Sequence, residues 1–335
     1  MTRTLPTALR PGHRIGLWTP SAPAPALFPR RYERARAALA GTGFEITEAP
    51  GTRGNTGVGA ADPRQLADDL HGLLTDDRVD AVMATTGGYT SLAVLPYIDW
   101  DLVRRARRPI IGYSDITAVL WATFARAGLV SFHGPMLVSE WGEWGGPWPY
   151  TIENFLRLLG GGAPVAFTPP PAWTDESLYW DVADDRRRIS TAATSWRCLR
   201  PGSAEGWLLP GCAPTASQLF GTPYLPEVDG AILCLEFPAM GPDQVWGYLL
   251  QWAQSGCLDR VAGLVIGRQC LPGTAAGGSG DYAAVIDAAV GDRRLPVLLD
   301  VDFGHTEPRI TLPVGVRARL DADAGTLTLL EGSTA

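Results

Sequence analysis

The stretch that decides the fold of this chain is Arg107-Arg108-Pro109-Ile110-Ile111-Gly112-Tyr113-Ser114-Asp115-Ile116-Thr117. Its apolar pair, Ile110 and Ile111, predicts a short buried strand, and apolar residues at helical spacing predict a helix over residues 115–128. Ser114 is therefore expected at a sharp turn between a strand and a helix. An α/β hydrolase presents its nucleophile at such a turn, where backbone N–H groups at the start of the helix face the oxygen that gains charge.

Ser114 has a second interpretation as the N-cap of the helix. Serine is a preferred capping residue, and Asp115 would suit the positive end of the helix dipole. The nucleophile motif Gly-x-Ser-x-Gly is also incomplete, because Ile116 stands in place of its second glycine. From this turn alone both interpretations stay open, and capping is the commoner role for a serine before a helix.

The chain has 335 residues and a formal net charge of −7 at pH 7. This length suits one large domain or two ordinary ones. The negative charge argues against a nucleic-acid-binding protein, which normally carries a basic field. All 28 basic residues are arginine, and this excludes Schiff-base catalysis by lysine, a Ser-Lys dyad and a P-loop.

Five cysteines without a Cys-x-x-Cys pair predict reduced thiols rather than a disulfide framework: Cys198, Cys212, Cys234, Cys257 and Cys270. Residues 1–17 lack the apolar core of a signal peptide, and no apolar run has the length of a membrane span. We therefore expect a soluble cytoplasmic protein with no membrane partner.

Strands and helices alternate through the first half of the chain. Strands are expected over residues 15–18, 44–47, 79–84 and 110–111, and helices over residues 31–40, 62–74 and 115–128. The alternation predicts a parallel sheet that binds ligands at the carboxyl ends of its strands. Ser114 and the turn Gly87-Gly88 both fall at such ends. The glycines would let a backbone N–H approach a substrate closely, although they would equally suit an ordinary turn.

The second half of the chain has a different pattern. A glycine run and a proline run, Gly160-Gly161-Gly162 and Pro169-Pro170-Pro171, indicate a boundary after a helix over residues 151–159. Beyond it, strands are expected over residues 231–237, 263–266, 314–320 and 327–330, with a helix near residues 244–254. We expect an N-terminal α/β domain over residues 1–159, a linker over 160–173 and a β-rich C-terminal domain over 174–335.

The candidates for a general base are the four histidines: His13, His71, His133 and His305. His13 precedes the first strand and His71 lies on a polar helix face, so both are expected to be structural or solvated. His305 follows the apolar residues 295–301 in a loop and neighbours Gly304, which suits an active-site loop. No metal-ligand spacing such as His-Glu-x-x-His occurs, so we expect neither a catalytic metal nor a cofactor.

Glu236 is the candidate acid that would orient the histidine. It ends the apolar run Ala231-Ile232-Leu233-Cys234-Leu235, where a charge is costly to bury without a partner. A solvated acid at the end of a strand is an equally ordinary interpretation. The order Ser114, Glu236, His305 is the serine–acid–histidine order of α/β hydrolases. The nearest alternative acids in sequence are Asp302 and Glu307.

Several linked motifs together resemble the LD-carboxypeptidase family of serine peptidases, which includes the microcin C self-immunity peptidases. The resemblance rests on the Ser114 stretch and on Ser131-Phe132-His133-Gly134-Pro135. It covers nearly the whole chain through residues 64–74, Val79-Asp80-Ala81-Val82, Gly87-Gly88-Tyr89, Leu95-Pro96-Tyr97-Ile98-Asp99, Gly221-Thr222-Pro223-Tyr224, residues 233–236 and Gly304-His305. The linked set is far more specific than any one of its parts.

The resemblance implies that Ser114 is the nucleophile, His305 the base and Glu236 the orienting acid. It also implies an oxyanion hole formed by the backbone N–H groups of Gly88 and Asp115. The implied architecture is a Rossmann-like N-terminal domain with a parallel sheet and a β-rich C-terminal domain of swivelling type. The active site would lie between the two domains, and the protein would be a homodimer.

Two further segments bear on the substrate. Gly87 and Tyr89 are expected to lie beside the substrate. Gly211-Cys212-Ala213-Pro214 departs from the Gly-Gly-Asn-Leu that is common in the family. This departure concerns the inter-domain loop and substrate preference, and it leaves the implied triad unchanged.

Two substrate classes follow from the resemblance. Murein recyclers of the family release terminal D-alanine from an L,D-tetrapeptide, whereas the immunity branch cleaves the amide that joins an acidic residue to a nucleotide analogue. Residues 173–181 look like the loop of the immunity branch in which a tryptophan stacks on the nucleobase, and Trp180 is the matching position. Such stacking contributes about 1–3 kcal/mol. Trp180 has a second interpretation, as packing at the domain interface.

We therefore expect a serine carboxypeptidase or amidase that acts on aminoacyl- or peptidyl-nucleotide antibiotics of the microcin C type. The murein LD-carboxypeptidase activity is the enzymatic alternative. The non-enzymatic alternative is a two-domain protein that binds a small ligand in its cleft, with Ser114 as a hydrogen-bonding cap.

Overall fold

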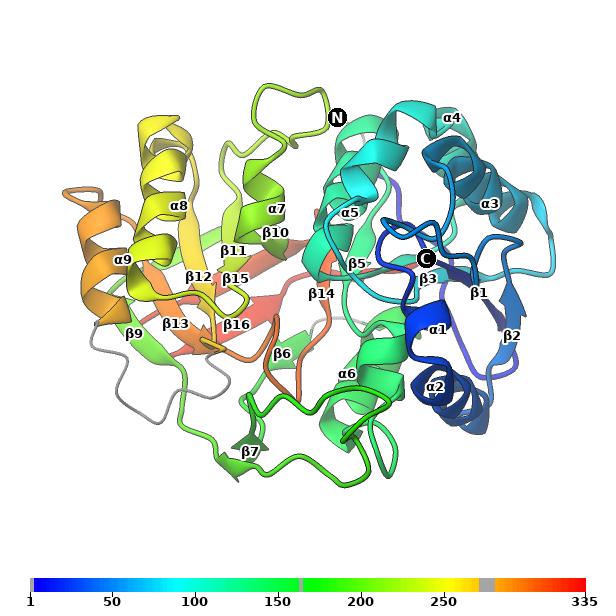
Figure 1. The fold of residues 1–335 in the computed structure, drawn as a ribbon. Coiled ribbons are helices and arrows are strands. Elements are labelled where there is room, and N and C mark those ends of the chain that lie inside the picture. Colours follow the sequence, from blue (N-terminus) through cyan, green and yellow to red (C-terminus); the bar gives the residue numbers. More distant parts are fainter. Residues whose placement is uncertain (1–2, 163–164, 271–280) are drawn as a thin grey trace.

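The computed structural model describes residues 3–162, 165–270 and 281–335. Two sheets lie next to each other, each with its own set of helices (Figure 1). Within these described ranges, no helix is both long enough and apolar enough to cross a membrane. The architecture is the α/β fold expected from the sequence, with a parallel-sheet N-terminal part and a strand-rich C-terminal part.

The first sheet has six strands in the order β14-β5-β4-β3-β1-β2. They are β1 (Arg14–Trp18), β2 (Glu45–Glu48), β3 (Ala81–Ala84), β4 (Ile110–Gly112), β5 (Ser131–His133) and β14 (Leu312–Val314). The first five pair in parallel, and β14 pairs antiparallel with β5. A strand from near the C-terminus thus completes the sheet that carries Ser114.

Helices cover both faces of this sheet because its strands are apolar on both sides. In β3, Val82 and Ala84 pack on one face and Ala81 and Met83 on the other. One face holds α3 (Pro63–Thr75), α4 (Trp100–Ala106) and α5 (Thr117–Ala122), and the other holds α2 (Pro29–Gly41) and α6 (Pro149–Leu159), with the short α1 (Ala24–Leu27) before α2 (Figure 1).

The helix expected over residues 115–128 is divided into three parts. A 3₁₀ turn at Ser114–Ile116 leads into α5, which continues as a π-helical turn at Thr123–Ala127. Gly128 ends it with a φ of +66°, a left-handed conformation that suits glycine. The division leaves Ser114 in a tight turn outside the regular helix.

The second sheet has eight strands in the order β6-β16-β15-β10-β11-β12-β13-β9. They are β6 (Val165–Phe167), β9 (Arg197–Arg200), β10 (Ser203–Cys212), β11 (Ile232–Glu236), β12 (Gly263–Gly267), β13 (Val297–Val301), β15 (Arg317–Asp321) and β16 (Thr326–Leu329). The four central strands β10 to β13 are parallel, and the others pair antiparallel. The other α-helices are α7 (Ala213–Ser217), α8 (Pro242–Gln254) and α9 (Tyr282–Val290), and the strands β7 (Ala172–Trp173) and β8 (Thr191–Ala192) form a small separate pair. Short 3₁₀ helices lie at Ser91–Tyr97 and Cys257–Asp259, and a π-helical turn lies at Leu137–Trp141.

The single strand expected over residues 314–320 is instead two strands in two different sheets. Gly315 separates β14 from β15 and has a φ of +91°. A Cβ at this position would lie 2.2 Å from the Phe124 ring. The chain therefore passes from the first sheet to the second at a residue that tolerates both the backbone conformation and the close approach.

Candidate active site

Ser114 follows the carboxyl end of β4 and has a φ of +60°, which is rare for a residue with a side chain. Its Oγ lies 3.1 Å from Nε2 of His305. The capping positions of the 3₁₀ turn and of α5 are Tyr113 and Ile116, and neither cap uses a side-chain hydrogen bond. The N-cap interpretation of Ser114 is therefore wrong: the strained turn directs the hydroxyl toward a histidine.

His305 and Glu236 come from the second sheet. Glu236 is the last residue of β11, and His305 lies in the loop after β13. Nδ1 of His305 is 2.7 Å from Oε2 of Glu236, whose side chain is 1% exposed. The carboxyl ends of β4, β11 and β13 meet. Ser114 and His305, which are 191 positions apart in sequence, therefore come into hydrogen-bond contact.

Two glycines make room for the Glu236 carboxylate. A Cβ at Gly304, which has a φ of +96°, would lie 2.7 Å from Oε2 of Glu236. A Cβ at Gly267, at the end of β12, would lie 2.8 Å from the Glu236 Cβ. The Glu236 side chain is thus packed closely against the chain at Gly304, beside its carboxylate, and at Gly267, beside its Cβ.

The electrostatics of the pair favour a charged carboxylate. Burial of Glu236 raises its pKa, but the charge and hydrogen bond of His305, with smaller contributions from His133 and Cys212, hold the pKa of Glu236 below its ordinary value. An ionised Glu236 accepts a hydrogen bond from the N–H at Nδ1 of His305, and this tautomer leaves Nε2 as an acceptor for the Ser114 hydroxyl. In this arrangement Nε2 of His305 can take the proton of the Ser114 hydroxyl.

The two alternative acids near His305 have other partners. Asp302 accepts hydrogen bonds from Nε of Arg268 at 2.6 Å and from Nε1 of Trp196 at 2.8 Å. Glu307 pairs with Arg309 at 2.5 Å. Asp302 and Glu307 are therefore close to His305 in sequence but engaged by other side chains.

The loop after β3 lies directly against the Ser114 turn. A Cβ at Gly87 would lie 2.9 Å from Oγ of Ser114. Gly88 has a φ of +151°, and a Cβ there would lie 2.3 Å from Oγ of Ser21. Both positions therefore require glycine. Tyr89, also expected beside the substrate, is 90% exposed.

Asp115 connects this loop to the nucleophile turn. Its Oδ2 accepts from the Ser21 hydroxyl at 2.6 Å and from the backbone N–H of Ser91 at 2.9 Å, and the Ser91 hydroxyl donates to the Asp115 carbonyl oxygen at 2.6 Å. Sequence reasoning missed both serines, because isolated serines in loops carry no recognisable spacing. Together they hold the backbone of residues 87–91 beside Ser114.

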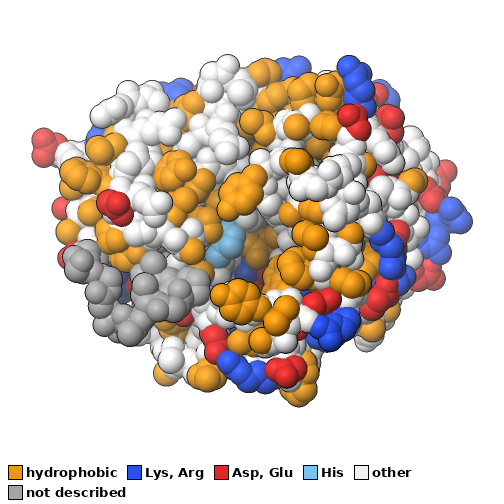
Figure 2. All heavy atoms as spheres, in the orientation of Figure 1, with side chains coloured by type: hydrophobic (Ala, Val, Ile, Leu, Met, Phe, Trp, Pro, Cys, Tyr) orange, Lys and Arg blue, Asp and Glu red, His pale blue; other side chains and the backbone are white. Residues whose placement is uncertain are grey.

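A cavity of about 520 Å³ lies next to His305. Its walls come from both halves of the chain, among them Phe28, Tyr113, Trp180, Ala239 and Arg309. Figure 2 shows a hollow near the middle of this face, with a histidine side chain inside it and hydrophobic side chains around it. Cavities of this size hold small molecules.

Trp180 lines the cavity and also packs against the N-terminal half. Its ring meets Phe28 edge-on at 5.2 Å, and the Arg31 guanidinium lies 4.6 Å from its centre. The next residue, Asp181, accepts hydrogen bonds from the backbone N–H groups of Arg30 and Arg31 at the start of α2. The structure therefore shows Trp180 packed against the N-terminal half and lining the cavity, and its stacking on a nucleobase stays a prediction.

A buried ionic cluster forms the floor of the cavity. The guanidinium of Arg309 stacks over the Tyr113 ring at 3.9 Å and pairs with both Glu140 and Glu307. The Tyr113 hydroxyl donates to Glu140 at 3.0 Å. Burial raises the pKa of Glu140 above its ordinary value despite the nearby charge of Arg309. Tyr113, which precedes Ser114, is thus held by Arg309 at its ring and by Glu140 at its hydroxyl.

His133 is fully buried beside the ring of Tyr113. Its ring packs against Tyr113 at 5.9 Å and Phe303 at 5.6 Å. Burial lowers the pKa of His133 to about 3, so this imidazole is neutral. In the part of the chain that the structure describes, no group of three or more His, Cys, Asp or Glu side chains is arranged to hold a metal ion.

Two family models match the two parts of the chain that form this site. The model of the LD-carboxypeptidase N-terminal domain matches residues 15–134, and that of the LD-carboxypeptidase C-terminal domain matches residues 205–320. The chain belongs to the LD-carboxypeptidase family. It is therefore an enzyme of the serine hydrolase class, and the non-enzymatic alternative is set aside.

Relatives in the family match over nearly the full chain. A Vibrio cholerae protein, provisionally named a carboxypeptidase, is 32% identical over 324 residues, covering 96% of each chain. The microcin C7 self-immunity protein MccF of Escherichia coli is 27% identical over 330 residues, covering 98% of this chain and 96% of its own.

Solved structures of family members superpose closely. MccF in complex with aspartyl sulfamoyl adenosine gives a TM-score of 0.93 at 27% identity, covering 99% of this chain and 100% of that one. An MccF-like protein from Bacillus anthracis gives 0.88 at 29% identity, covering 98% and 99%. MccF has also been solved with glutamyl sulfamoyl guanosine.

Proposed function

We propose that the protein is a metal-independent serine peptidase in which Ser114, His305 and Glu236 act as a catalytic triad. The observation that carries the proposal is the continuous chain from Oγ of Ser114 to Nε2 of His305 at 3.1 Å and from Nδ1 to Glu236 at 2.7 Å. The buried carboxylate orients the ring and stabilises the imidazolium that forms during the reaction.

In the first step, Oγ of Ser114 attacks the carbonyl carbon of the substrate amide, and its proton moves to Nε2 of His305. The backbone N–H groups of Gly88 and Asp115 stabilise the oxyanion of the tetrahedral intermediate. Collapse breaks the C–N bond, and His305 gives its proton to the leaving nitrogen. Water then attacks the acyl-enzyme, with His305 again as base, to release the acid and restore Ser114.

We propose that the substrate is an aminoacyl- or peptidyl-nucleotide of the microcin C type. The support is threefold: Trp180 lines the cavity, the cavity has the volume of a small-molecule site, and the relative MccF binds aminoacyl sulfamoyl nucleotides. The homodimer implied by the family resemblance also stays a prediction, which light scattering of the purified protein tests.

A fluorophosphonate probe tests the triad. We expect it to label Ser114 in the wild type, and we expect the label to disappear in Ser114→Ala and to be strongly reduced in His305→Ala. Each substitution should lower kcat by about 10³-fold or more, because triad members act as a unit. The proposal would be contradicted if Ser114→Ala turned over substrate at the wild-type rate. It would also be contradicted if a chelator abolished the activity of the wild type.

The substrate is tested by mass spectrometry of two reactions run in parallel. One contains an acidic aminoacyl-sulfamoyl adenosine, and the other an L,D-tetrapeptide of murein. We expect faster cleavage of the first, with release of the free amino acid. Selective release of D-alanine from the tetrapeptide would instead assign the protein to murein recycling.

A further inference from the structure

Tyr113 is connected to both the proposed nucleophile and the proposed base. Along the chain it precedes Ser114, whose φ of +60° is rare for a residue with a side chain. Through space its ring lies edge-on against the His305 ring, with 5.2 Å between the ring centres. A strained backbone such as that of Ser114 persists only where the surrounding contacts hold it. The position of the Tyr113 ring therefore bears on both sides of the contact between Oγ and Nε2.

The Tyr113 ring is held from the second half of the chain. The guanidinium of Arg309 lies over its face, with 3.9 Å between Cζ and the ring centre. Arg309 and His305 belong to the same loop, between β13 and β14. The loop that carries the base thus also contacts the residue next to the nucleophile, at the place where the two sheets meet.

Both partners of this stacked contact are anchored separately. The guanidinium of Arg309 pairs with Glu140 at 3.1 Å and with Glu307 at 2.5 Å. The backbone N–H of Arg309 donates to Oγ1 of Thr151 at 2.9 Å, and the Tyr113 hydroxyl donates to Glu140 at 3.0 Å. All three charged side chains are at most 3% exposed. A guanidinium bound by two buried carboxylates has a fixed orientation, and it fixes the ring that it covers.

We propose that Arg309 and Tyr113 are a positioning pair, through which the loop of the base holds the turn of the nucleophile and sets the separation of Oγ of Ser114 from Nε2 of His305. The inference rests on the proposed triad and deepens it. A guanidinium suits this place because it is planar: it stacks on an aromatic face and presents N–H groups to two carboxylates at once. An ammonium group would keep the charge but could not stack flat on the ring.

Three substitutions separate the parts of this pair. Tyr113→Phe keeps the ring but loses the bond to Glu140, Tyr113→Leu removes the ring, and Arg309→Lys keeps the charge without the stack. The rate of fluorophosphonate labelling reports the geometry of Ser114 and His305, because the probe is small and needs no contact with a nucleotide site. We expect labelling to slow about 10- to 100-fold in Tyr113→Leu and Arg309→Lys, the cost of a displacement on the order of 1 Å, and less in Tyr113→Phe. In each variant kcat should fall in step with labelling, and KM should change less.

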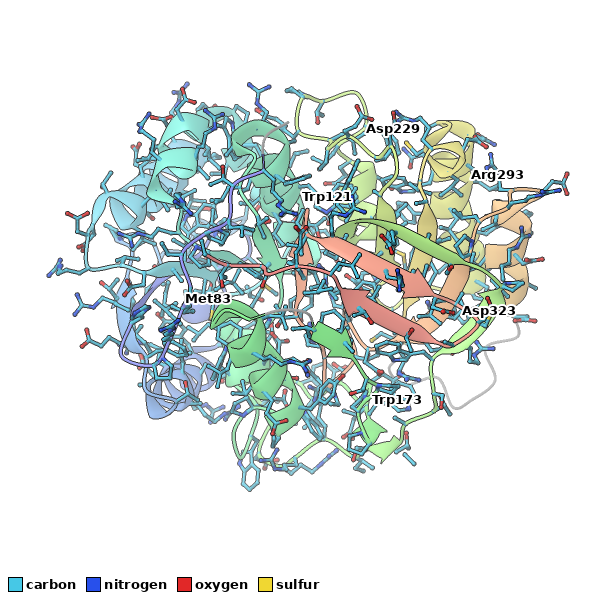
Figure 3. The ribbon with its side chains drawn as sticks, turned by 180° about the vertical axis from the view of Figure 1, so that it is seen from behind. Met83, Trp121, Trp173, Asp229, Arg293 and Asp323 are labelled. Atoms are coloured by element: carbon cyan, nitrogen blue, oxygen red, sulfur yellow. The ribbon has the colours of Figure 1, made fainter. Side chains whose placement is uncertain are left out.

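Arg268 offers a matched control. It is also a buried arginine, its Nε pairs with Asp302 at 2.6 Å, and its guanidinium lies 5.0 Å from the centre of the Trp173 ring, which is labelled in Figure 3. Arg268→Lys should therefore lower the melting temperature but leave labelling near the wild-type rate. The positioning role is wrong if Arg268→Lys slows labelling as much as Arg309→Lys does. It is also wrong if Arg309→Lys is labelled as fast as the wild type.

The NMR signal of the His305 ring gives a readout that does not depend on activity. Its Hε1 resonance, identified by its loss in His305→Gln, is sensitive to the ring current of Tyr113. We expect this resonance to move in Arg309→Lys and to stay in place in Arg268→Lys. An unmoved resonance in Arg309→Lys overturns the inference even if the triad is right. Conversely, a moved resonance together with a fully active Ser114→Ala would refute the triad and leave the contact between the two loops standing.

Discussion

The guanidinium carbon of Arg31 lies 4.6 Å from the centre of the Trp180 ring, close enough for a cation–π contact. Arg31 is itself immobilised, since it pairs with Glu143 at 2.8 Å and with Asp184 at 3.0 Å while 3% exposed. An indole held in this way loses little freedom when a substrate arrives. On the proposed function, the contact holds a flat wall in place for the nucleobase of the substrate.

The first prediction concerns this wall. Trp180→Ala should lower kcat/KM for an aminoacyl-sulfamoyl adenosine by roughly 5- to 150-fold, the range of one base-stacking contact. Cleavage of a tetrapeptide should change little. The control is Trp246→Ala, a half-exposed tryptophan of α8 that does not line the cavity. Equal losses on both substrates, with earlier melting, would show that Trp180 serves packing alone.

The second prediction concerns the attachment of the loop to α2. Asp181 accepts from the N–H groups of Arg30 and Arg31 and has a φ of +58°. Asp181→Ala removes both acceptors. Loss of such a cap at a helix N-terminus costs about 0.5–2 kcal/mol of stability. We expect KM for the nucleotide substrate to rise about 2- to 30-fold with kcat nearly constant. Asp181→Asn, which tolerates the same backbone conformation, should lose less; identical losses would argue against the attachment.

The third prediction separates the orienting acid from a merely buried one. Glu236→Gln should fold normally but reduce kcat by up to about 10⁴-fold, because the amide favours the wrong histidine tautomer. Asp302→Asn is the counterpart, since it weakens the Arg268 pair and should lower the melting temperature while retaining most of kcat. An unchanged rate for Glu236→Gln would mean that another acid holds His305.

The fourth prediction follows from the neutral His133. An unfolded histidine titrates near pH 6.5, whereas burial lowers the pKa of His133 to about 3. Between these values the unfolded state binds more protons, so His133 makes stability fall as the pH drops from about 6.5 toward 3. In His133→Phe the melting temperature should fall less between pH 7 and pH 5 than in the wild type. His13→Gln, outside the core, is the control; parallel curves for His133→Phe and wild type would refute the prediction.

Periodicity predicted several strands, among them β1, β3, β4, β11 and β12, but it missed the longest one. The longest strand, β10, contains Gly206, Pro210 and Gly211, residues that normally argue against a central strand. Their tertiary setting explains them: a Cβ at Gly206 would lie 2.1 Å from the Gly230 carbonyl oxygen, and one at Gly211 would lie 2.7 Å from Thr117. Close approach of neighbouring segments overrides local propensity here, and no single-segment pattern records it.

The site was only partly accessible to sequence reasoning. The turn around Ser114 is local, so its strand-to-helix setting could be recognised from spacing. Ser114 meets Glu236 and His305 where the strand ends of the two sheets come together. The order of the three residues suggested the set only weakly, and the family resemblance made it specific. The cluster of Glu140, Glu307 and Arg309 was missed, because charged residues far apart in sequence give no sign that they are buried together.

On the proposed mechanism, the division of the triad between the two sheets has a consequence during synthesis. The ribosome delivers Ser114 early, but its base lies 191 positions further on, and β14, which completes the serine's own sheet, comes later still. A growing chain therefore carries an ordinary alcohol with no partner to withdraw its proton. Hydrolysis therefore begins only after His305 and β14 have been synthesised and have folded against the sheet that carries Ser114.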